Sequence, residues 1–248
     1  MILKDKTAVI TGSSKGIGFE ILKLFAENGC NIVGCFRSNS DDFSQKISEI
    51  SKKNKVKIIP IQFDFMNDEE IIKSAKQIIS LDLNIDILVN NAGAIENNIF
   101  QMVNIQKAKD IFQVNFFGTL LFTQYIVKKM MRKRSGTIIN ISSTSAFDPN
   151  KGRSIYSSSK SALKTAFEVI STELSPHIRI NNIAPGLTNT KMMHNFTSQD
   201  SIDKYIQRLN IKRVAEASEI AKVALFLSSD SSYYINGQTI RVDGGLFN

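Results

Sequence analysis

The sequence contains few of the residues that build metal centres or disulfide frameworks. Two cysteines and two histidines are present in 248 residues, with four prolines and no tryptophan. Cys30 and Cys35 lie five residues apart, an odd spacing that points them to opposite faces of a strand. His177 and His194 are isolated from each other. The sequence therefore favours buried free thiols and predicts neither a disulfide nor a metal site.

Long apolar runs are also missing. No stretch approaches the roughly 20 apolar residues that a membrane helix needs. Lys4, Asp5 and Lys6 interrupt the first ten residues, which argues against a signal peptide and favours a first strand. We therefore expect a cytoplasmic protein with no membrane partner.

The net charge of +8 raises the question of nucleic-acid binding. The lysines are spread along the chain in short runs such as Lys128-Lys129, and no recognition motif accompanies them. A solvated basic surface that attracts acidic ligands or partners is the favoured interpretation. We expect no nucleic-acid partner.

Strand-like runs alternate with amphipathic helical stretches along the whole chain. The expected strands cover residues 6–11, 31–36, 56–61, 85–90, 136–142, 178–184 and 238–242. The expected helices start near Gly16, Asp41, Asp68, Asn104, Ile155 and Ser218. This order predicts one α/β domain over residues 1–248, a Rossmann-type, doubly wound parallel sheet of seven strands with helices on both faces.

The segment 188–213 interrupts this alternation. It contains Met192, Met193 and Phe196 and is long for a connection. A mobile lid over a substrate site and a helical insertion packed on the sheet both fit this pattern. We expect a substrate lid that sets the pocket shape together with the loop 144–154.

A glycine-rich turn, TGSSKGIG at residues 11–18, follows the first strand. The glycines permit a tight turn, and the N-terminus of the next helix offers free N–H groups to a pyrophosphate. The Gly-xxx-Gly-x-Gly spacing is neither the common Gly-x-Gly-x-x-Gly fingerprint nor a Walker loop. A purely structural turn is the alternative. The favoured interpretation is a dinucleotide site that uses Gly12, Ser14, Lys15, Gly16, Ile17 and Gly18.

The end of the second strand indicates which dinucleotide binds. A site for NAD needs an acid near this position for the ribose 2′-hydroxyl. Residues 31–40 contain no acid, Arg37 occupies the corresponding place, and Lys15 could reach the same point. Two cations without a carboxylate suit a 2′-phosphate, so we predict NADP(H). If Arg37 were only an exposed surface charge, the preference would stay open.

Tyr156 and Lys160 lie four residues apart in a segment with a helical pattern, so both side chains project from one face. A nearby ammonium favours the charged form of a phenol, whose ordinary pKa is about 10. The pair can therefore supply a proton donor and acceptor near neutral pH. Because isolated pairs of this kind are mostly solvated helix surface, the surrounding motifs decide the interpretation.

These motifs, in this order, resemble the short-chain dehydrogenase/reductase family over essentially the whole chain. They are the glycine turn, Asn90-Asn91-Ala92-Gly93, Asn115 in VNFFG, Ser143 in IINISS thirteen residues before Tyr156, Pro185-Gly186, and the tail VDGG at 242–245. The resemblance implies that Tyr156 is the acid/base that protonates a substrate carbonyl. It also implies that Lys160 lowers the pKa of Tyr156 and holds the nicotinamide ribose.

The same resemblance assigns two further catalytic residues. Ser143 would donate a hydrogen bond to the carbonyl oxygen, with Ser142 as the competing serine and capping of the strand end as the alternative role. Asn115 would bind a water that links Lys160 to solvent, unless its amide is satisfied by backbone inside the helix. Preplaced donors at this oxygen would stabilise the alkoxide that hydride transfer creates.

Cofactor contacts are also implied by the resemblance. Asp64 and the backbone of Phe65 would meet the adenine, although Asp64 could instead cap the strand end. Asn91, Ala92 and Gly93 would line the adenosine ribose. The residues expected at the nicotinamide amide are Pro185, Gly186 and Thr188.

Within this family the sequence most resembles 3-oxoacyl-[acyl-carrier-protein] reductases, which use NADPH to reduce a 3-oxoacyl thioester to the 3-hydroxyacyl product. Arg134 falls where those enzymes keep an arginine that docks the acidic carrier protein, and a homotetramer is usual. The departures are Pro176 or His177 at the second docking position, Glu96 in place of a basic residue, and a missing glycine after Arg213. A reductase of another ketone or keto-sugar, and a silent NADP sensor or scaffold, are the alternatives.

Overall fold

A parallel sheet of seven strands runs through the middle of the molecule. This computed structural model describes residues 1–38, 41–148 and 150–246. The strand order is β3-β2-β1-β4-β5-β6-β9, and every neighbouring pair is parallel. The strands are β1 (Thr7–Thr11), β2 (Asn31–Phe36), β3 (Ile58–Gln62), β4 (Ile87–Asn90), β5 (Gly136–Ile141), β6 (Ile178–Pro185) and β9 (Thr239–Val242). The predicted Rossmann-type, doubly wound fold is confirmed.

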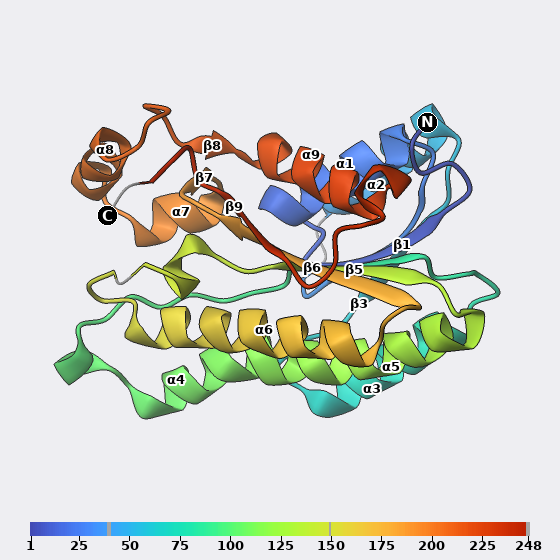
Figure 1. Cartoon of the computed structure of the whole chain (residues 1–248), viewed down its shortest axis with the longest axis horizontal. Coiled ribbons are helices and arrows are strands. Elements are labelled where there is room, and N and C mark those ends of the chain that lie inside the picture. Colours follow the sequence, from blue (N-terminus) through green and yellow to red (C-terminus); the bar gives the residue numbers. More distant parts are fainter. Residues whose placement is uncertain (39–40, 149, 247–248) are drawn as a thin grey trace.

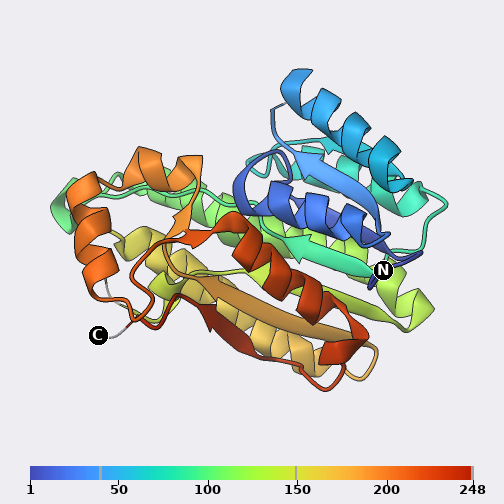
Figure 2. The same cartoon turned by 90° about the horizontal axis from the view of Figure 1, so that it is seen from above.

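Helices cover both faces of the sheet (Figure 1). One layer contains α1 (Gly16–Glu27), α2 (Asp41–Asn54) and α9 (Ala217–Ser228). The other contains α3 (Asp68–Ser80), α4 (Ile105–Phe112), α5 (Gly118–Lys133) and α6 (Ser154–Glu173). Seen from above, α2 lies near one edge of the sheet and β9 near the opposite edge (Figure 2). Residues 247–248 of the expected domain and Pro149 of the expected pocket loop lie outside the described residues.

Burial on both faces explains the sequence of the central strands. Every residue of β1 is buried, as expected for a strand that helices cover from both sides. Phe25 of α1 belongs to the apolar core on one face, and Phe122 and Phe167 belong to the core on the other. Cys30 and Cys35 lie in opposite cores as buried free thiols, so that prediction is confirmed.

A ladder of buried amides crosses the sheet near its carboxyl edge. Asn90, Asn140 and Asn182 stand in register on β4, β5 and β6, with at most 3% of each residue exposed. Asn90 Nδ2 donates to Asn140 Oδ1 at 2.8 Å, and Asn140 Nδ2 donates to Asn182 Oδ1 at 2.9 Å. Thr123 of α5 and Thr239 of β9 accept at the two ends, at 3.0 and 3.1 Å. The ladder fixes the strand register directly below the residues of the candidate site.

The connection between α4 and α5 departs from the expected single helix that starts near Asn104. Residues Gln113–Phe117 form one π-helical turn that contains Asn115. Such turns insert a residue into the α-helical ladder and occur frequently at functional sites. The sequence pattern does not distinguish this turn from ordinary helix.

The segment 188–213 folds as a helical insertion closed at its base by a small parallel sheet. Its elements are β7 (Thr188–Asn189), α7 (Lys191–Phe196) and α8 (Gln199–Gln207), and β7 pairs with β8 (Ala215–Glu216). Both helices lie at the end of the molecule drawn on the left in Figure 1. Asn97 Nδ2 donates to the carbonyl of Phe196 at 2.7 Å, so the end of α7 contacts the loop that follows β4.

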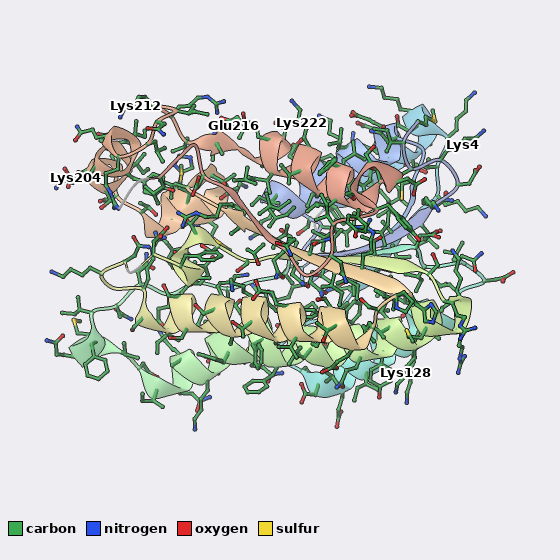
Figure 3. All side chains as sticks on the ribbon, in the orientation of Figure 1. Lys4, Lys128, Lys204, Lys212, Glu216 and Lys222 are labelled. Atoms are coloured by element: carbon green, nitrogen blue, oxygen red, sulfur yellow. The ribbon has the colours of Figure 1, made fainter. Side chains whose placement is uncertain are left out.

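The positive charge is distributed over the molecule. Lys4, Lys128, Lys204 and Lys222 are exposed on separate elements and extend in different directions (Figure 3). This arrangement fits a generally basic surface better than a nucleic-acid groove. Within the described ranges, none of the helices has the length and apolar character needed to cross a membrane.

Candidate active site

The expected site residues converge on the carboxyl edge of the sheet. The strand order reverses between β1 and β4, and parallel sheets of this type bind ligands in the crevice at such a reversal. The glycine turn follows β1, Asn91 to Gly93 follow β4, Ser143 follows β5, and Gly186 follows β6. Tyr156 and Lys160 approach the same edge from the first turns of α6.

The side chain of Ser143 acts on the phenol of Tyr156 and favours its charged form. The Ser143 hydroxyl accepts a hydrogen bond from the N–H of Ser145 at 3.1 Å, which orients it at the start of the loop. Ser142 has a different role, since its hydroxyl donates to the carbonyl of Lys160 at 3.2 Å. Of the two competing serines, Ser143 is the one that acts on Tyr156.

Burial raises the pKa of Tyr156 above its ordinary value, because it disfavours the charged phenolate. The side chain of Ser143 and the charge of Arg153 act in the opposite direction. The effect of Lys160 on the acidity of Tyr156 stays a prediction.

Lys160 is itself buried, with 4% of the residue exposed. Its amine donates to the carbonyl of Ile141 at 2.8 Å, at the end of β5. Burial lowers the pKa of Lys160 to about 8, because the ammonium loses hydration. The side chain can therefore gain or lose a proton close to neutral pH.

Asn115 is fully buried, and both of its amide donors are occupied. Nδ2 donates to the carbonyl of Ala94 and to the hydroxyl of Ser159, each at 2.9 Å, and Oδ1 accepts from the N–H of Ala94 at 2.7 Å. The contacts with Ala94 fit the alternative interpretation, in which backbone groups satisfy the side-chain amide of Asn115. A Cβ on Gly93 would lie 3.4 Å from both Asn115 Oδ1 and Lys160 Nζ, so Gly93 leaves space beside this pair.

The glycine turn is packed too closely for side chains. A Cβ on Gly18 would lie 2.3 Å from the carbonyl oxygen of Gly12 and 2.4 Å from Asn91 Nδ2. Gly12 itself has a φ of 65°, a left-handed conformation that favours glycine. Gly12 precedes α1 and Gly18 lies in its first turn, so the glycines let the turn pack closely between the start of this helix and Asn91. The N–H groups at the N-terminus of α1 can face a pyrophosphate.

The side-chain amide of Asn91 contacts the glycine turn. Its amide donates to the carbonyls of Thr11 and Gly12 at 3.0 and 3.1 Å. The Thr11 hydroxyl in turn accepts from the N–H groups of Asn91 and Ala92 at 2.9 and 3.0 Å. Asn91 and Thr11 thus hold the ends of β1 and β4 together, while Ala92 and Gly93 remain partly exposed along the edge.

The two cations expected at the 2′-phosphate are exposed. Neither Lys15 nor Arg37 makes an ion pair within the described part of the chain. The backbone of Arg37 is held by Gln62, whose amide donates to the Arg37 carbonyl at 3.1 Å. The first turn of α1 has no acidic residue that would repel a phosphate.

The residues expected at the adenine have structural roles as well. The Asp64 carboxylate accepts from the N–H of Met66 at 3.0 Å, which is the local capping role given as the alternative. The Phe65 ring is buried against Phe63 and Phe122, with centroids 5.0 and 5.8 Å away. Only the partly exposed remainder of Asp64 and the Phe65 backbone could meet a ligand.

Pro185, Gly186 and Thr188 form the opposite side of the crevice. Thr188 is buried and its hydroxyl donates to the carbonyl of Gly186 at 3.1 Å, so its side chain braces this loop. Nearby, a Cβ on Gly16 would lie 3.3 Å from the Thr190 methyl group. The base of the segment 188–213 therefore lies against the glycine turn.

Sequence reasoning missed several residues of this edge. Tyr205 of α8 accepts from the N–H of Leu187 at 3.2 Å. Arg241 of β9 forms an ion pair with Asp148 at 2.6 Å. Because these contacts join segments that are distant in the chain, no local sequence pattern predicts them.

A hollow of about 870 Å³ lies apart from these residues, between α3 and α4. Met66, Ile105, Gln113 and Phe117 are among its lining residues, and the expected catalytic residues are not. The chemistry of the edge, not the size of this hollow, therefore identifies the candidate site.

Comparison with known proteins agrees with this geometry. The sequence pattern of the short chain dehydrogenase family matches residues 6–201. The 3-oxoacyl-[acyl-carrier-protein] reductase of Aquifex aeolicus is 34% identical over 247 residues, which cover 99% of this chain and 98% of that protein. The chain belongs to the short-chain dehydrogenase family and is an oxidoreductase that acts on CH–OH or C=O groups with a nicotinamide cofactor.

Solved structures of the same family superpose closely. A 7α-hydroxysteroid dehydrogenase complexed with NADH and 7-oxo glycochenodeoxycholic acid has a TM-score of 0.92 at 28% identity, covering 98% of this chain and 95% of that chain. An NADPH-dependent reductase involved in bacilysin biosynthesis has a TM-score of 0.92 at 27% identity, covering 99% of both chains. One neighbour is named with NADH and the other with NADPH.

Proposed function

We propose that this protein is an NADPH-dependent carbonyl reductase whose main substrate is a 3-oxoacyl thioester on acyl carrier protein. The observation that carries the proposal is the convergence of Ser143, Tyr156 and the buried amine of Lys160 at the carboxyl edge of the sheet, where the glycine turn opens. The proposal treats the chain as one domain, with the segment 188–213 as its substrate lid.

The residues present fit a dinucleotide. Gly12 and Gly18 allow the turn to pack closely at the start of α1, whose N-terminus offers N–H groups and has no acidic residue in its first turn. Lys15 and Arg37 would bind the 2′-phosphate, Asp64 the adenine side, and Gly93 and Gly186 the ribose and nicotinamide side. When bound, NADPH supplies the hydride that the protein cannot supply.

The raised pKa of Tyr156 suits the reduction direction. A phenol that keeps its proton at neutral pH can donate it to a carbonyl oxygen as that oxygen becomes an alkoxide. Ser143 would donate a second hydrogen bond to the same oxygen. The overall change takes ketone, NADPH and one proton to alcohol and NADP⁺.

Lys160 would serve the reaction in two ways. Its amine would bind the ribose hydroxyls next to the nicotinamide, in place of or in addition to the carbonyl of Ile141. Because its pKa is about 8, it can also pass a proton inward to replace the one that Tyr156 gives up. Asn115, whose side chain is held by Ala94 and Ser159, would bind the water that links Lys160 to solvent.

Two observations support a carrier-protein substrate. Arg134 is exposed at the end of α5, where its backbone turns into the left-handed region with a φ of 57°. The relatives matched over nearly the whole chain include several reductases with this substrate. Glu96 and His177 depart from those enzymes, which favours a reductase of another ketone or keto-sugar as the second candidate. A silent NADP sensor is disfavoured because all four catalytic positions are filled.

A homotetramer is part of the proposal. The exposed apolar residues Ile105 and Phe117 border the hollow between α3 and α4, on the helices next to Asn115. A second copy of the chain would cover them, and the tail after β9 would form another contact. Sedimentation of the purified protein tests the assembly.

The decisive experiment is NADPH oxidation with a panel of carbonyl compounds, read at the nicotinamide absorbance. The panel contains 3-oxoacyl groups on acyl carrier protein and on a small thiol, a steroid ketone and a keto-sugar. We expect turnover of the carrier-bound thioester, loss of turnover in Tyr156→Phe with NADPH binding retained, and a raised KM for the carrier substrate alone in Arg134→Glu. Tight NADPH binding without turnover of any ketone would contradict the enzyme assignment.

A further inference from the structure

Tyr205 extends from helix α8 of the lid to the loop that follows β6. Its hydroxyl accepts a hydrogen bond from the N–H of Leu187 at 3.2 Å, and the side chain of Thr144 is the other polar group that acts on it. Thr144 directly follows Ser143, and Leu187 lies between Gly186 and Thr188. One phenol thus connects the lid to the residue after Ser143 and to the loop expected at the nicotinamide.

The fit around this hydroxyl is close. A Cβ on Gly186 would lie 2.6 Å from the Tyr205 oxygen and 2.9 Å from the Cα of Asp243. Gly186 therefore leaves the space into which the Tyr205 hydroxyl projects. A close contact of this kind shows that the loop, the tail and α8 are arranged as one packed unit.

A cluster of ion pairs lies on the other side of the loop that contains Thr144. Arg241 contacts Asp148 at 2.6 Å and Asp243 at 2.8 Å. Asp148 is buried and belongs to the same loop as Thr144. Burial makes this pair weakly screened by salt. The loop that contains Thr144 is thus fixed from the side of β9, so that Tyr205 meets a preformed partner.

The base of the lid is held separately. Thr188 and Asn189 of β7 pair with Ala215 and Glu216 of β8, which closes the segment where it leaves and re-enters the sheet layer. Arg213 binds Glu219 at the start of α9. These contacts anchor the ends of the segment, whereas the Tyr205 hydroxyl contacts the active-site wall from the middle of α8.

We propose that Tyr205 is a positioning residue that keeps the lid docked on the active site through Thr144 and Leu187. Through these contacts it orients Ser143 and the loop after β6 for catalysis. This inference rests on the proposed function for its kinetic consequences, while the docking itself is a property of the free protein. Losing the hydroxyl shifts the lid toward an open state, in which substrate binds more weakly.

The test compares Tyr205→Phe with Tyr234→Phe, which makes the same change at a fully exposed tyrosine. We expect Tyr205→Phe to raise KM for the ketone and to lower kcat/KM roughly two- to tenfold, the range of one neutral hydrogen bond. We expect kcat at saturating substrate to fall less, because bound substrate closes the lid again. Tyr234→Phe should have the same KM, kcat and kcat/KM as the unsubstituted protein.

A second measurement does not need turnover. Trypsin can cleave after Lys204 and Arg208 of the lid, and we expect faster cleavage there in Tyr205→Phe at unchanged thermal stability. NADPH at saturation should slow this cleavage in both proteins. Thr144→Val should have the same effect, and the double variant should be no worse than the worse single variant.

The outcomes separate the two hypotheses. Unchanged KM and cleavage in Tyr205→Phe, or additive losses in the double variant, would overturn the docking role. If the unsubstituted protein reduces no ketone but Tyr205→Phe still exposes Lys204 and Arg208 to trypsin, the docking stands and the proposed function fails. A loss of stability in Tyr205→Phe that matches the gain in cleavage would assign the hydroxyl a merely structural role and contradict the inference.

Discussion

The amine of Lys160 donates to the carbonyl of Ile141 at 2.8 Å, two residues before Ser143 in the chain. This contact joins α6 to the end of β5. No hydrogen bond links Lys160 to Tyr156 among the residues that the structure describes, and the pKa of the phenol is raised. In this arrangement Lys160 joins α6 to the edge of the sheet through the carbonyl of Ile141.

The first prediction concerns the pH dependence of NADPH binding. The pKa of Lys160 is about 8, so its charge and one N–H donor disappear as the pH rises through this value. We expect the Kd for NADPH, measured by fluorescence titration, to be flat below about pH 7 and to rise above pH 8. The step should persist in Tyr156→Phe and vanish in Lys160→Met. A step that survives in Lys160→Met would assign the titration to another group.

The second prediction concerns stability. Lys160 has a pKa of about 8 when folded and 10.5 when unfolded, so between these values the unfolded chain binds more protons. Stability therefore rises with pH across this window, and the penalty of burying the ammonium is fully present below pH 8. Its upper limit is about 3 kcal/mol. We expect the stability of Lys160→Met relative to the unsubstituted protein to fall by up to that amount between pH 8 and 10.5.

Urea denaturation at several pH values measures this difference. Loss of the bond to Ile141 in Lys160→Met makes a constant contribution, so only the change with pH tests the prediction. Lys128→Met, at an exposed position, is the matched control and should give a flat difference. A flat difference in Lys160→Met as well would show that the amine is hydrated in the folded protein.

Most of the fold could be predicted from the sequence, because a strand that is buried on both faces gives a continuous run of apolar residues. β1 is a continuous buried run, and the predicted strand 178–184 differs from the observed β6 by one residue. The pairing of β7 with β8 could not be predicted, because two-residue strands carry no periodicity. The π-helical turn at Asn115 could not be predicted either, because the helical sequence pattern continues through it.

The candidate site divides in the same way. The thirteen-residue spacing before Tyr156 favoured Ser143 over Ser142, and Ser143 follows β5 while Tyr156 lies in the first turn of α6. The raised pKa of Tyr156 could not be predicted, since it depends on burial by segments distant in the chain. For the same reason the contact between the Asn91 amide and the glycine turn could not be predicted. Contacts that involve Tyr205 depend on tertiary packing alone.

The third prediction concerns the choice of nucleotide. Arg37 is exposed at the end of β2 with its backbone held by Gln62, and Lys15 opens α1. A guanidinium in this position would bind a 2′-phosphate, whereas a carboxylate would bind a ribose 2′-hydroxyl. We expect Arg37→Asp to lower the ratio of kcat/KM for NADPH over NADH roughly 10- to 100-fold. Steady-state kinetics with both nucleotides measures the ratio.

The control for this change is Arg132→Asp, which alters the net charge equally at an exposed residue of α5. It should leave the ratio unchanged, because charges far apart at the surface are screened by salt. If Arg37→Asp left the ratio of kcat/KM for NADPH over NADH unchanged, the cation near β2 would be only a surface charge. The protein would then not bind the 2′-phosphate at this position.

The last prediction concerns the amide ladder below the site. Asn140 is completely buried and is bonded on both sides, to Asn90 and to Asn182. In Asn140→Leu the Oδ1 of Asn182 loses a donor, and Asn90 keeps only Thr123 while its own Oδ1 already lacks a partner among the described residues. A buried polar atom without a partner costs about 1–3 kcal/mol. We expect the free energy of unfolding in urea to fall by about 2–4 kcal/mol.

The same substitution at the exposed Asn84 provides the control and should change the free energy of unfolding by less than about 0.5 kcal/mol. Because the ladder fixes the register of β4, β5 and β6 just before Asn91 and Ser143, Asn140→Leu should also weaken NADPH binding under conditions where the variant is fully folded. If Asn140→Leu were as stable as the control, the strand register would be held by apolar packing alone, and the amides would be replaceable.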